Sequence, residues 1–461
     1  MDSSLFATPN TPVHIVGIGG AGMSAIARVL IGRGLRVSGS DRGAGPAVQE
    51  LAALGATVHV GHAADHVQAP AAVLISSAVK DDNPEVVAAR AAGIPVLKRR
   101  EALPHLLAGK TQIAVAGTHG KTTTTSMIAH ILLATGRDPS YIVGGTLANT
   151  GDNARAGNGD AFVIEADEYD YMFLGLNPTI AVLTNVEHDH PDMFPTLDLV
   201  MYAFRQFIGL IPEYDGVLIA CADDPNAAQL AREHRMIGQP TLTYGLKEGP
   251  NWYAEKRGVG QFTVHGVQDG KKVRRRASIT LPGDHNIQNA LAALAAAVAY
   301  GIPLPEAISA LETFRGAGRR FEPVGTVNGV LYISDYGHHP TAIRATLQAG
   351  REAYPKARLW AVWQPHTYSR TRLLAAEFAE SLRGADRALI TDIYAAREVY
   401  QGGDPTAAGL AESARGAGVN ATASGDLAAT AALLRVEAQP GDVVIIFSAG
   451  DAPEIVGMVG G

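Results

Sequence analysis

A glycine-rich loop between an apolar segment and a helical pattern carries the strongest chemical signal in the sequence. It reads Gly117-Thr118-His119-Gly120-Lys121-Thr122-Thr123 and follows the strand-like segment Gln112 to Ala116. In such a loop, backbone amides surround phosphate groups, Lys121 supplies a point charge to the terminal phosphates, and the Thr122 hydroxyl can ligate Mg²⁺. Val115 stands where the general motif has its first glycine. A chance Gly-Lys-Thr is common, but its position between a strand and a helix favours an ATP site.

Acidic residues follow the next two predicted strands, at positions suited to a metal ion. Glu165 opens the run Glu165-Ala166-Asp167-Glu168 after the strand Phe162 to Ile164, and His190 ends the segment that follows the strand Thr179 to Leu183. A parallel sheet would bring both strand ends beside the loop. Mg²⁺ prefers hard oxygen ligands, so Glu165 is the natural candidate, with His190 as a second ligand or a phosphate contact.

Other interpretations of these acidic residues stay open. Asp167, Glu168 and Asp170 could equally form a solvated strand end. Zinc is less favoured than magnesium, because no cysteine pair or spaced histidine pair joins the cluster.

A second glycine turn lies near the amino terminus. Gly17, Gly19 and Gly22 fit the dinucleotide fingerprint, in which a helix N-terminus and backbone N–H groups face a pyrophosphate. Asp41 ends the next predicted strand, where a ribose hydroxyl would be bound. A purely structural turn competes with this interpretation, but the position between strand and helix favours a nucleotide diphosphate.

The elements that must position these residues form three strand and helix alternations, typical of parallel sheets. We therefore predict an α/β protein with three domains: a Rossmann-like domain at 1–107, a central P-loop ATPase-like domain with a mixed sheet at 108–315, and a Rossmann-like domain at 316–461. The segment Trp252 to Ile279 is predicted as an antiparallel excursion at the edge of the central sheet. Gly316-Ala317-Gly318 is predicted to be a hinge.

Composition excludes several classes of protein. The 461 residues are 47% hydrophobic and carry a net charge of −7, which argues against disorder and against nucleic acid as a partner. The basic run Lys271 to Arg276 is short and lacks aromatic residues, so we expect a solvated hairpin. No apolar run is long enough to span a bilayer, and a single cysteine, Cys221, fits a reducing compartment. We expect a cytoplasmic protein without membrane insertion.

Nine segments resemble, in order along the chain, those of the Mur ligases of peptidoglycan synthesis. The segments are Gly17 to Ser24, Ser38 to Asp41, Ala116 to Thr125, Glu165 to Glu168, Asn185 to His190, His285 to Ala290, Arg319 to Phe321, Asp335 to Pro340 and Gln364 to Thr371. They run through all three predicted domains. Tyr169 departs from the serine usual after Glu168, and Ser334 stands where an aspartate often precedes Asp335.

The resemblance implies one substrate for each domain. In the first, the diphosphate of a UDP sugar would lie on the turn formed by Gly19, Gly20, Gly22, Met23 and Ser24, with Asp41 and Ser77 near the uridine. In the second, the loop 117–123 would hold ATP, with Mg²⁺ near Thr122, Glu165 and His190.

The same resemblance assigns residues around the hinge. Asn286 and Asn289 would contact the adenine side, and Arg320 and Asp335 would approach ATP from across the hinge. The third domain would bring His338, His339, His366 and Arg370 toward an incoming amino acid, whose carboxylate suits the Arg370 guanidinium. Considered alone, the residues favour plainer roles: the two consecutive histidines as a helix cap and Arg370 on a solvated face.

The implied activity is ATP-dependent ligation of L-alanine to the carboxylate of UDP-N-acetylmuramate through an acyl phosphate. Lys121, Glu165, His190 and Arg320 are the expected catalytic residues. Alternatives are the related ligase that recycles a murein tripeptide, a nicotinamide dehydrogenase and a P-loop switch ATPase. The Gln364 to Thr371 segment favours the L-alanine enzyme. We expect a monomer or a weak homodimer.

Overall fold

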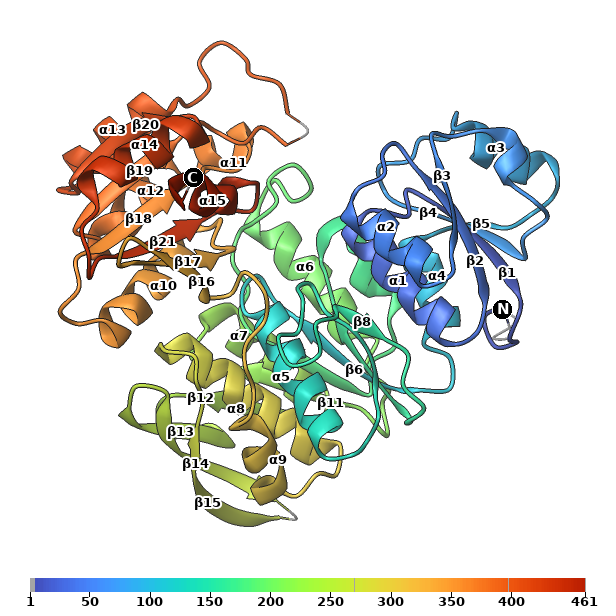
Figure 1. The fold of residues 1–461 in the computed structure, drawn as a ribbon. Coiled ribbons are helices and arrows are strands. Elements are labelled where there is room, and N and C mark those ends of the chain that lie inside the picture. Colours follow the sequence, from blue (N-terminus) through green and yellow to red (C-terminus); the bar gives the residue numbers. More distant parts are fainter. Residues whose placement is uncertain (1–4, 269, 397, 461) are drawn as a thin grey trace.

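Three separate sheets organise the chain, each with helices packed against it (Figure 1). The computed structural model describes residues 5–268, 270–396 and 398–460. The sheets confirm the predicted α/β class, and the two predicted domain boundaries fall in connectors between secondary structure elements. No helix within the described ranges is long and apolar enough to cross a membrane.

The first unit has a five-stranded parallel sheet in the order β3-β2-β1-β4-β5. Its strands are β1 (Pro12–Val16), β2 (Arg36–Asp41), β3 (Thr57–Val60), β4 (Ala72–Ile75) and β5 (Val96–Lys98). Its helices are α1 (Ala21–Gly32), α2 (Pro46–Ala53), α3 (Pro84–Ala91) and α4 (Arg99–Leu106). The strand order reverses between β1 and β4, and the first glycine turn lies at that switch point, where α/β sheets bind ligands.

The central unit has a ten-stranded mixed sheet in the order β15-β14-β13-β12-β11-β10-β6-β9-β7-β8. Its strands are β6 (Thr111–Ala116), β7 (Ser140–Ile142), β8 (Ala154–Arg155), β9 (Ala161–Glu165), β10 (Ile180–Leu183), β11 (Val217–Cys221), β12 (Thr241–Gly245), β13 (Trp252–Gly258), β14 (Gln261–Gln268) and β15 (Lys271–Ser278). Its α-helices are α5 (Lys121–Ala134), α6 (Leu197–Ile208), α7 (Pro225–Met236), α8 (Asp284–Ala299) and α9 (Leu304–Leu311). The antiparallel strands β13 to β15 confirm the predicted excursion.

Strand pairing in this sheet explains how the chemical residues meet. β6 lies between β9 and β10 and is parallel to both, with Val115 opposite Glu165 and Ala116 opposite Leu183. The carboxyl ends of the three strands therefore lie at one edge, which was the arrangement expected from the sequence. Helices α5 and α8 pack together against the sheet, and the small alanine side chains of α8 permit their close approach.

The third unit has a six-stranded sheet in the order β16-β17-β21-β18-β19-β20, parallel except for β16. The strands are β16 (Glu322–Val327), β17 (Val330–Asp335), β18 (Leu359–Trp363), β19 (Arg387–Thr391), β20 (Ala421–Gly425) and β21 (Val443–Phe447). The helices are α10 (Pro340–Ala353), α11 (Tyr368–Leu373), α12 (Ala375–Ser381), α13 (Ala407–Gly416), α14 (Leu427–Glu437) and α15 (Ile455–Gly460).

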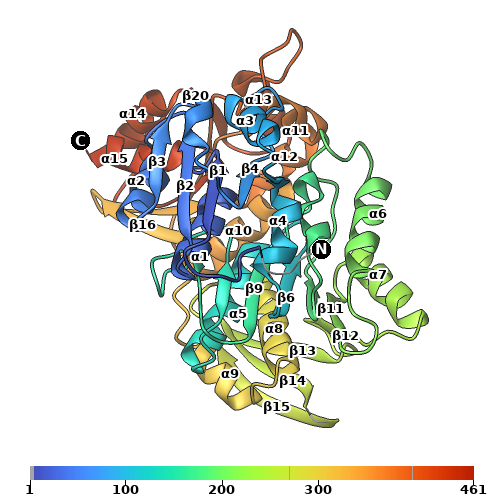
Figure 2. The same ribbon diagram turned by 90° about the vertical axis from the view of Figure 1, so that its right-hand side faces the viewer.

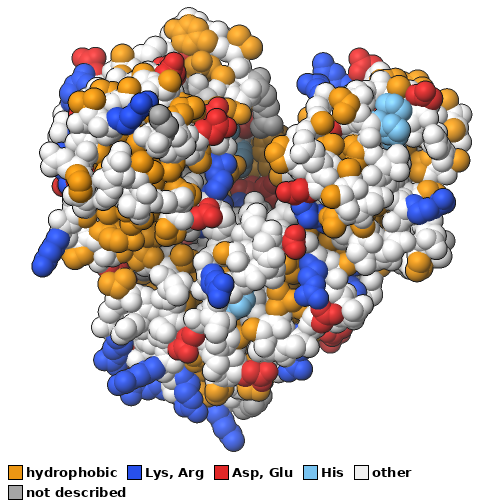
Figure 3. All heavy atoms as spheres, in the orientation of Figure 1, with side chains coloured by type: hydrophobic (Ala, Val, Ile, Leu, Met, Phe, Trp, Pro, Cys, Tyr) orange, Lys and Arg blue, Asp and Glu red, His pale blue; other side chains and the backbone are white. Residues whose placement is uncertain are grey.

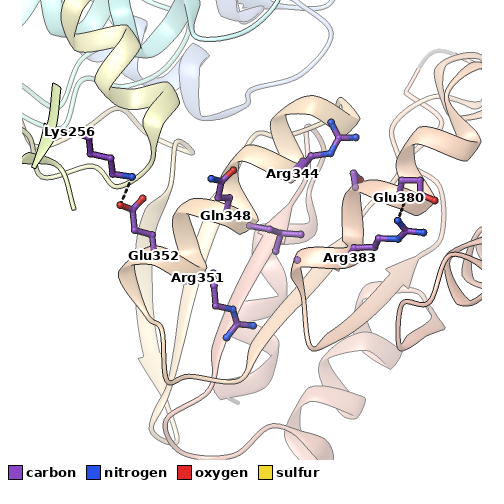
Figure 4. A pocket seen from close by; sticks show the side chains of 10 residues that line it. Lys256, Arg344, Gln348, Arg351, Glu352, Glu380 and Arg383 are labelled. Atoms are coloured by element: carbon purple, nitrogen blue, oxygen red, sulfur yellow. Dashed lines mark ion pairs between the residues drawn. The ribbon is translucent and has the colours of Figure 1, made fainter. Parts of the chain in front are cut away.

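Hydrogen bonds hold the connector between the second and third units. The Gly318 amide donates to the carbonyl of Thr146 at 2.7 Å, and the Ala148 amide donates to the carbonyl of Gly316 at 3.0 Å. Farther along the same interface, Lys256 of β13 and Glu352 of α10 form an ion pair at 2.7 Å (Figure 4). In the view turned by 90° (Figure 2), the first unit lies above the central unit and in front of the third. The segment predicted as a hinge is thus hydrogen-bonded to the central unit, and its role as a hinge stays a prediction.

A buried carboxylate holds the first unit together beneath its glycine turn. Glu85 accepts hydrogen bonds from the Ser40 hydroxyl at 2.5 Å, from His62 Nδ1 at 3.0 Å and from His66 Nδ1 at 2.7 Å. His14 Nε2 lies 3.6 Å from the same carboxylate. Burial opposes ionisation, but these four side chains outweigh it and lower the pKa of Glu85 to about 2. Glu85 is therefore an anion throughout the neutral range.

Replacing Glu85 with glutamine removes that charge without changing its shape. We expect Glu85→Gln to lower the free energy of unfolding by about 2–3 kcal/mol at pH 7, measured by urea denaturation. Because the folded pKa is depressed, the stabilisation is complete above the ordinary value of 4.5 and is lost as the pH falls toward 2. The free energies of unfolding of the wild type and the variant should therefore converge as the pH falls from 4.5 toward 2.

The matched control is Glu50→Gln on α2, where the carboxylate is solvent-exposed. A surface ion pair contributes about 1 kcal/mol or less, so this variant should stay close to wild type. Equal losses in the two variants would contradict a special role for Glu85.

Candidate active site

A cavity of about 690 Å³ lies where the three units meet, and all three contribute to its walls. Figure 3 shows the molecule hollowed between the units. The first unit contributes Gly22 and Arg99, the central unit contributes the loop after β6, and the third unit contributes residues after β17 and β18. We call this space the central cavity. Every expected ATP contact except Gly117 lines it: Thr118, His119, Gly120, Lys121, Thr122, Thr123, Asn286, Asn289, Arg320 and Asp335.

The phosphate loop, residues 117–123, joins β6 to α5 and places the helix N-terminus in the wall of the cavity. Gly117 and Gly120 have φ values of 138° and 79°, which side chains rarely adopt. A Cβ at Gly117 would also collide with the Thr184 hydroxyl, so only glycine fits there. The free amides and positive pole of α5 form an anion site.

The Lys121 side chain is 12% exposed in this wall, and its ammonium has a close anionic partner. Its Nζ donates to the two Glu168 carboxylate oxygens at 2.8 and 3.1 Å and to the Gly117 carbonyl at 2.5 Å. Burial acts to lower the pKa of Lys121, but the carboxylates of Glu168, Asp167 and Glu165 raise it overall. Lys121 is therefore a firmly held cation at the loop.

Glu168 is a site residue that the sequence analysis did not select. Its side chain is only 3% exposed, so the solvated strand end considered above is wrong for this residue. Burial raises the pKa of Glu168 to about 7 despite the neighbouring Lys121. Glu168 lies in the same acidic run as Glu165, and this was the signal that the sequence offered. The sequence of the run does not show which of its carboxylates contacts Lys121.

Glu165 and Thr122 flank one tight turn. Glu165 Oε2 accepts from the Gly144 amide at 2.8 Å, and Gly145, the next residue, lies against the Thr122 side chain. Arg320, from beyond the hinge, donates through Nη2 to Thr122 Oγ1 at 3.0 Å. The structure thus brings Arg320 to the phosphate loop, where the resemblance placed it.

His190 lies in a strained loop beside these groups. Its φ of 54° is unusual for a non-glycine residue, and its Nε2 is 3.9 Å from Glu168 Oε1. Burial lowers the pKa of His190, which keeps the imidazole neutral and leaves a nitrogen lone pair available to a metal.

The two asparagines of α8 lie directly behind the loop. Asn289 Oδ1 accepts from the Thr124 hydroxyl at 3.2 Å, and a Cβ on Gly120 would be only 2.5 Å from the same oxygen. Asn286 donates to the Pro282 carbonyl at 2.8 Å and accepts from Asn289 Nδ2 at 3.3 Å. Both amides are buried and fixed at the cavity wall.

Asp335, at the end of β17, holds the backbone that faces the cavity. Its carboxylate accepts from the amides of Phe321 at 2.9 Å and Gly337 at 2.8 Å. Burial raises the pKa of Asp335. Asp335 thereby holds two turns together. One carries Arg320, and the other carries His338 and His339.

Arg370 connects the third unit to the central one. Its Nε donates to Asp189 Oδ1 at 2.8 Å, and its Nη1 lies 3.3 Å from His366 Nδ1. His338 Nε2 lies 3.6 Å from the other Asp189 oxygen. Arg370 is 5% exposed, so a solvated face is wrong for it. Asp189 was missed, although the segment containing it had been singled out.

His339 has two partners. It is the N-cap of α10, accepting through Nδ1 from the Thr341 amide at 3.3 Å, as the plainer interpretation predicted. The same nitrogen lies 3.3 Å from Glu187 Oε2, which is also 3.2 Å from His119 Nε2. Glu187 was not selected from the sequence either, because its partners come from distant segments.

A second cavity, of about 780 Å³, lies in the first unit alone. Gly17, Gly19, Gly20 and Asp41 line it, and Asp41 Oδ2 accepts from the Gly19 amide at 2.8 Å. Gly22 faces the central cavity instead. The glycine turn and the start of α1 thus contribute residues to both cavities.

Three other residues expected at the sugar site do not line the second cavity. Met23 is buried in α1, and the Ser24 hydroxyl donates to the Ala21 carbonyl at 3.1 Å. Ser76, rather than Ser77, lines the second cavity. The Ser77 hydroxyl donates to Asp170 of the central unit at 2.6 Å. Sugar contacts by Met23, Ser24 and Ser77 stay predictions.

Family profiles match the chain in three consecutive parts. The Mur ligase family catalytic domain matches residues 12–111, the Mur ligase middle domain matches 115–297, and the Mur ligase glutamate ligase domain matches 319–450. Together these matches include the glycine turn, the phosphate loop and the third-unit residues of the central cavity.

Two relatives match nearly the whole chain. A UDP-N-acetylmuramate–L-alanine ligase of Renibacterium salmoninarum is 45% identical over 442 residues, with 96% of this chain and 94% of the relative covered. An enzyme of the same name from Thermobifida fusca is 44% identical over 454 residues, with 96% and 94% covered.

Solved structures show the same three-part arrangement. The UDP-N-acetylmuramate–alanine ligase of Thermotoga maritima has a TM-score of 0.78 at 28% identity, covering 97% of this chain and 98% of its own. A murein peptide ligase of Psychrobacter arcticus has a TM-score of 0.70 at 28% identity, with the same coverage. With full-length relatives above 40% identity and all three of its parts matched, the chain belongs to the Mur ligase family.

Proposed function

We propose that this chain joins L-alanine to the carboxylate of UDP-N-acetylmuramate with ATP as the energy source, in the synthesis of peptidoglycan precursors. The observation that carries the proposal is the central cavity, which exposes a phosphate loop with a buried lysine to groups from two further units. The two full-length relatives bear this activity in their names. A phosphate switch or a dehydrogenase would need no such convergence of three units.

ATP would lie along the phosphate loop. The amides at the start of α5 face its phosphates, and Lys121 would exchange Glu168 for a phosphate oxygen. Asn286 and Asn289 form the wall toward the adenine. Arg320, already hydrogen-bonded to Thr122, would neutralise charge on the transferred phosphoryl group from across the hinge.

Mg²⁺ would be held by Thr122, Glu165 and His190. The donor set fits, because a carboxylate, a hydroxyl and a neutral imidazole line the same cavity beside the phosphate loop. When bound, the ion neutralises phosphate charge and orients the terminal phosphate. The Gly144 amide holds the Glu165 carboxylate in place.

The proposed reaction activates a carboxylate that is otherwise inert toward amines. A carboxylate oxygen of the sugar attacks the γ-phosphorus, and the bond to ADP breaks to give an acyl phosphate. The alanine amine then attacks the acyl carbon, loses a proton, and inorganic phosphate leaves from the tetrahedral intermediate. The protein contributes position and charge neutralisation through Lys121 and Arg320. A cavity lined by three units would limit the access of water to the acyl phosphate.

The amino acid would enter from the third unit. Arg370, held by Asp189 through Nε and in contact with His366 through Nη1, would present Nη2 to a carboxylate. His338 and His366 lie beside it. We place the reaction in the cytoplasm, in keeping with the single buried thiol of Cys221. A monomer or weak homodimer stays our expectation.

Substrate dependence tests the proposed reaction. We expect phosphate release from ATP to require UDP-N-acetylmuramate and L-alanine together, with only background release when either is omitted. Coupled phosphate detection and mass spectrometry of the ligated product measure the outcome. Release from ATP alone would contradict a ligase, and product formation with a murein tripeptide but not with L-alanine would identify the recycling enzyme.

Replacing Lys121 with alanine should reduce kcat/KM for ATP by about 10³-fold or more, because it removes the ammonium that would contact the terminal phosphates. Steady-state phosphate release measures the change. Lys247→Ala, at an exposed position, is the matched control and should match wild type. Equal activity in the two variants would refute the ATP assignment.

Metal removal tests the proposed magnesium ligands. EDTA should abolish ligation, and added Mg²⁺ should restore it. In Glu165→Gln, the Mg²⁺ concentration for half-maximal activity should rise roughly tenfold or more, because a charged ligand is lost. Glu248→Gln, on an exposed loop, should leave the Mg²⁺ requirement unchanged. An unchanged requirement in Glu165→Gln would exclude this carboxylate as a ligand.

A further inference from the structure

Two histidines and a glutamate converge in the central cavity, apart from the oxygen-rich magnesium set. The Glu187 carboxylate oxygen Oε2 lies 3.2 Å from His119 Nε2 and 3.3 Å from His339 Nδ1. One donor atom from each of the three side chains lies within 4.8 Å of the other two. The imidazole rings approach to 4.7 Å between centroids.

These separations match those of donors that share one small cation. With metal–ligand bonds of about 2.0–2.2 Å, two ligands of a tetrahedral Zn²⁺ ion lie about 3.3 Å apart. The two measured separations from Glu187 are already at that value. To enclose an ion the imidazoles would rearrange, and His339 Nδ1 would exchange its hydrogen bond from the Thr341 amide for the ion.

The surroundings also fit a metal site. Thr341 Oγ1 donates to the second Glu187 oxygen at 3.2 Å, which orients the carboxylate from outside the cluster. All three side chains line the central cavity, so a fourth coordination position would be open to water or to a ligand. Three protein ligands with one open position are typical of reactive zinc sites.

We propose that His119, Glu187 and His339 form a second cation site, selective for a borderline transition ion of the Zn²⁺ class. Two imidazoles and one carboxylate favour such an ion over Mg²⁺, which prefers oxygen ligands. The site is separate from Thr122, Glu165 and His190, and it does not depend on the ligation reaction.

The site would connect two units of the protein. His119 belongs to the phosphate loop and Glu187 to the segment after β10, whereas His339 caps α10 in the third unit. A bound ion would therefore tie the third unit to the phosphate loop. Binding of the ion would stabilise this arrangement of the units by mass action.

Cobalt absorption spectroscopy on the full chain tests the proposal. Co²⁺ is titrated in the absence of nucleotide, with excess Mg²⁺ present to occupy the oxygen-rich set. We expect one equivalent of Co²⁺ to produce the intense visible bands of four- or five-coordinate cobalt, and one equivalent of Zn²⁺ to remove them. Wild-type protein without these bands would overturn the proposal.

Two variants locate the ion. His339→Asn removes the imidazole, and asparagine remains a good N-cap for α10, so the fold is preserved. Glu187→Gln removes the central charge. Each should weaken Co²⁺ binding at least tenfold, with unchanged circular dichroism. Undiminished binding in both would overturn the proposal.

Matched controls exclude other sites. His265→Asn on β14 and Glu165→Gln at the magnesium set should keep the wild-type bands. Bands lost in Glu165→Gln but kept in His339→Asn would place the ion at the magnesium set and overturn the proposal. Because the readout is metal binding, failure here leaves the ligase assay unaffected, and failure of the ligase assay leaves this result intact.

Discussion

The ion pair between the Lys121 ammonium and the Glu168 carboxylate is the interaction on which the site depends. A buried charge without a partner costs several kcal/mol, so this position needs an anion at all times. Glu168 and the Gly117 carbonyl meet that need in the chain alone. A phosphate that replaces Glu168 leaves the carboxyl buried, and its pKa near 7 allows it to take up a proton at little cost. The Lys121–Glu168 pair thus prepares the loop for a polyanion without leaving a free buried charge.

Polar contacts of the same kind join the third unit to the central one. Arg320 reaches Thr122, and Arg370 reaches Asp189, each across from the third unit to the central one. Both arginines come from segments beside the carboxyl ends of β17 and β18, and their partners follow β6 and β10. The parallel parts of the two sheets therefore face each other through the edges at which their loops carry polar groups. This geometry places the polar side chains of the candidate active site between the central and third units.

Local sequence was enough to find the phosphate loop, the glycine turn and most strands, because each is a short apolar run with a glycine signal beside it. It failed where pairing is between distant segments: Glu168, Glu187 and Asp189 were in recognised motifs, yet only the fold shows which partner each one contacts. Several strands were not predicted, among them β20, since Ala421–Gly425 has little apolar character and is only partly buried.

The prediction of the metal ion from the sequence was also limited by contacts between distant segments. From the sequence, zinc was disfavoured because no histidine pair has ligand spacing, and that reasoning holds for each domain alone. His119 and His339 become neighbours only when the third unit packs against the phosphate loop. The oxygen donors Thr122 and Glu165 belong to the central unit by itself, so a hard ion can be held there whatever the position of the third unit. A nitrogen-rich set needs His339, and its affinity for a borderline ion is thereby linked to closure of the domains.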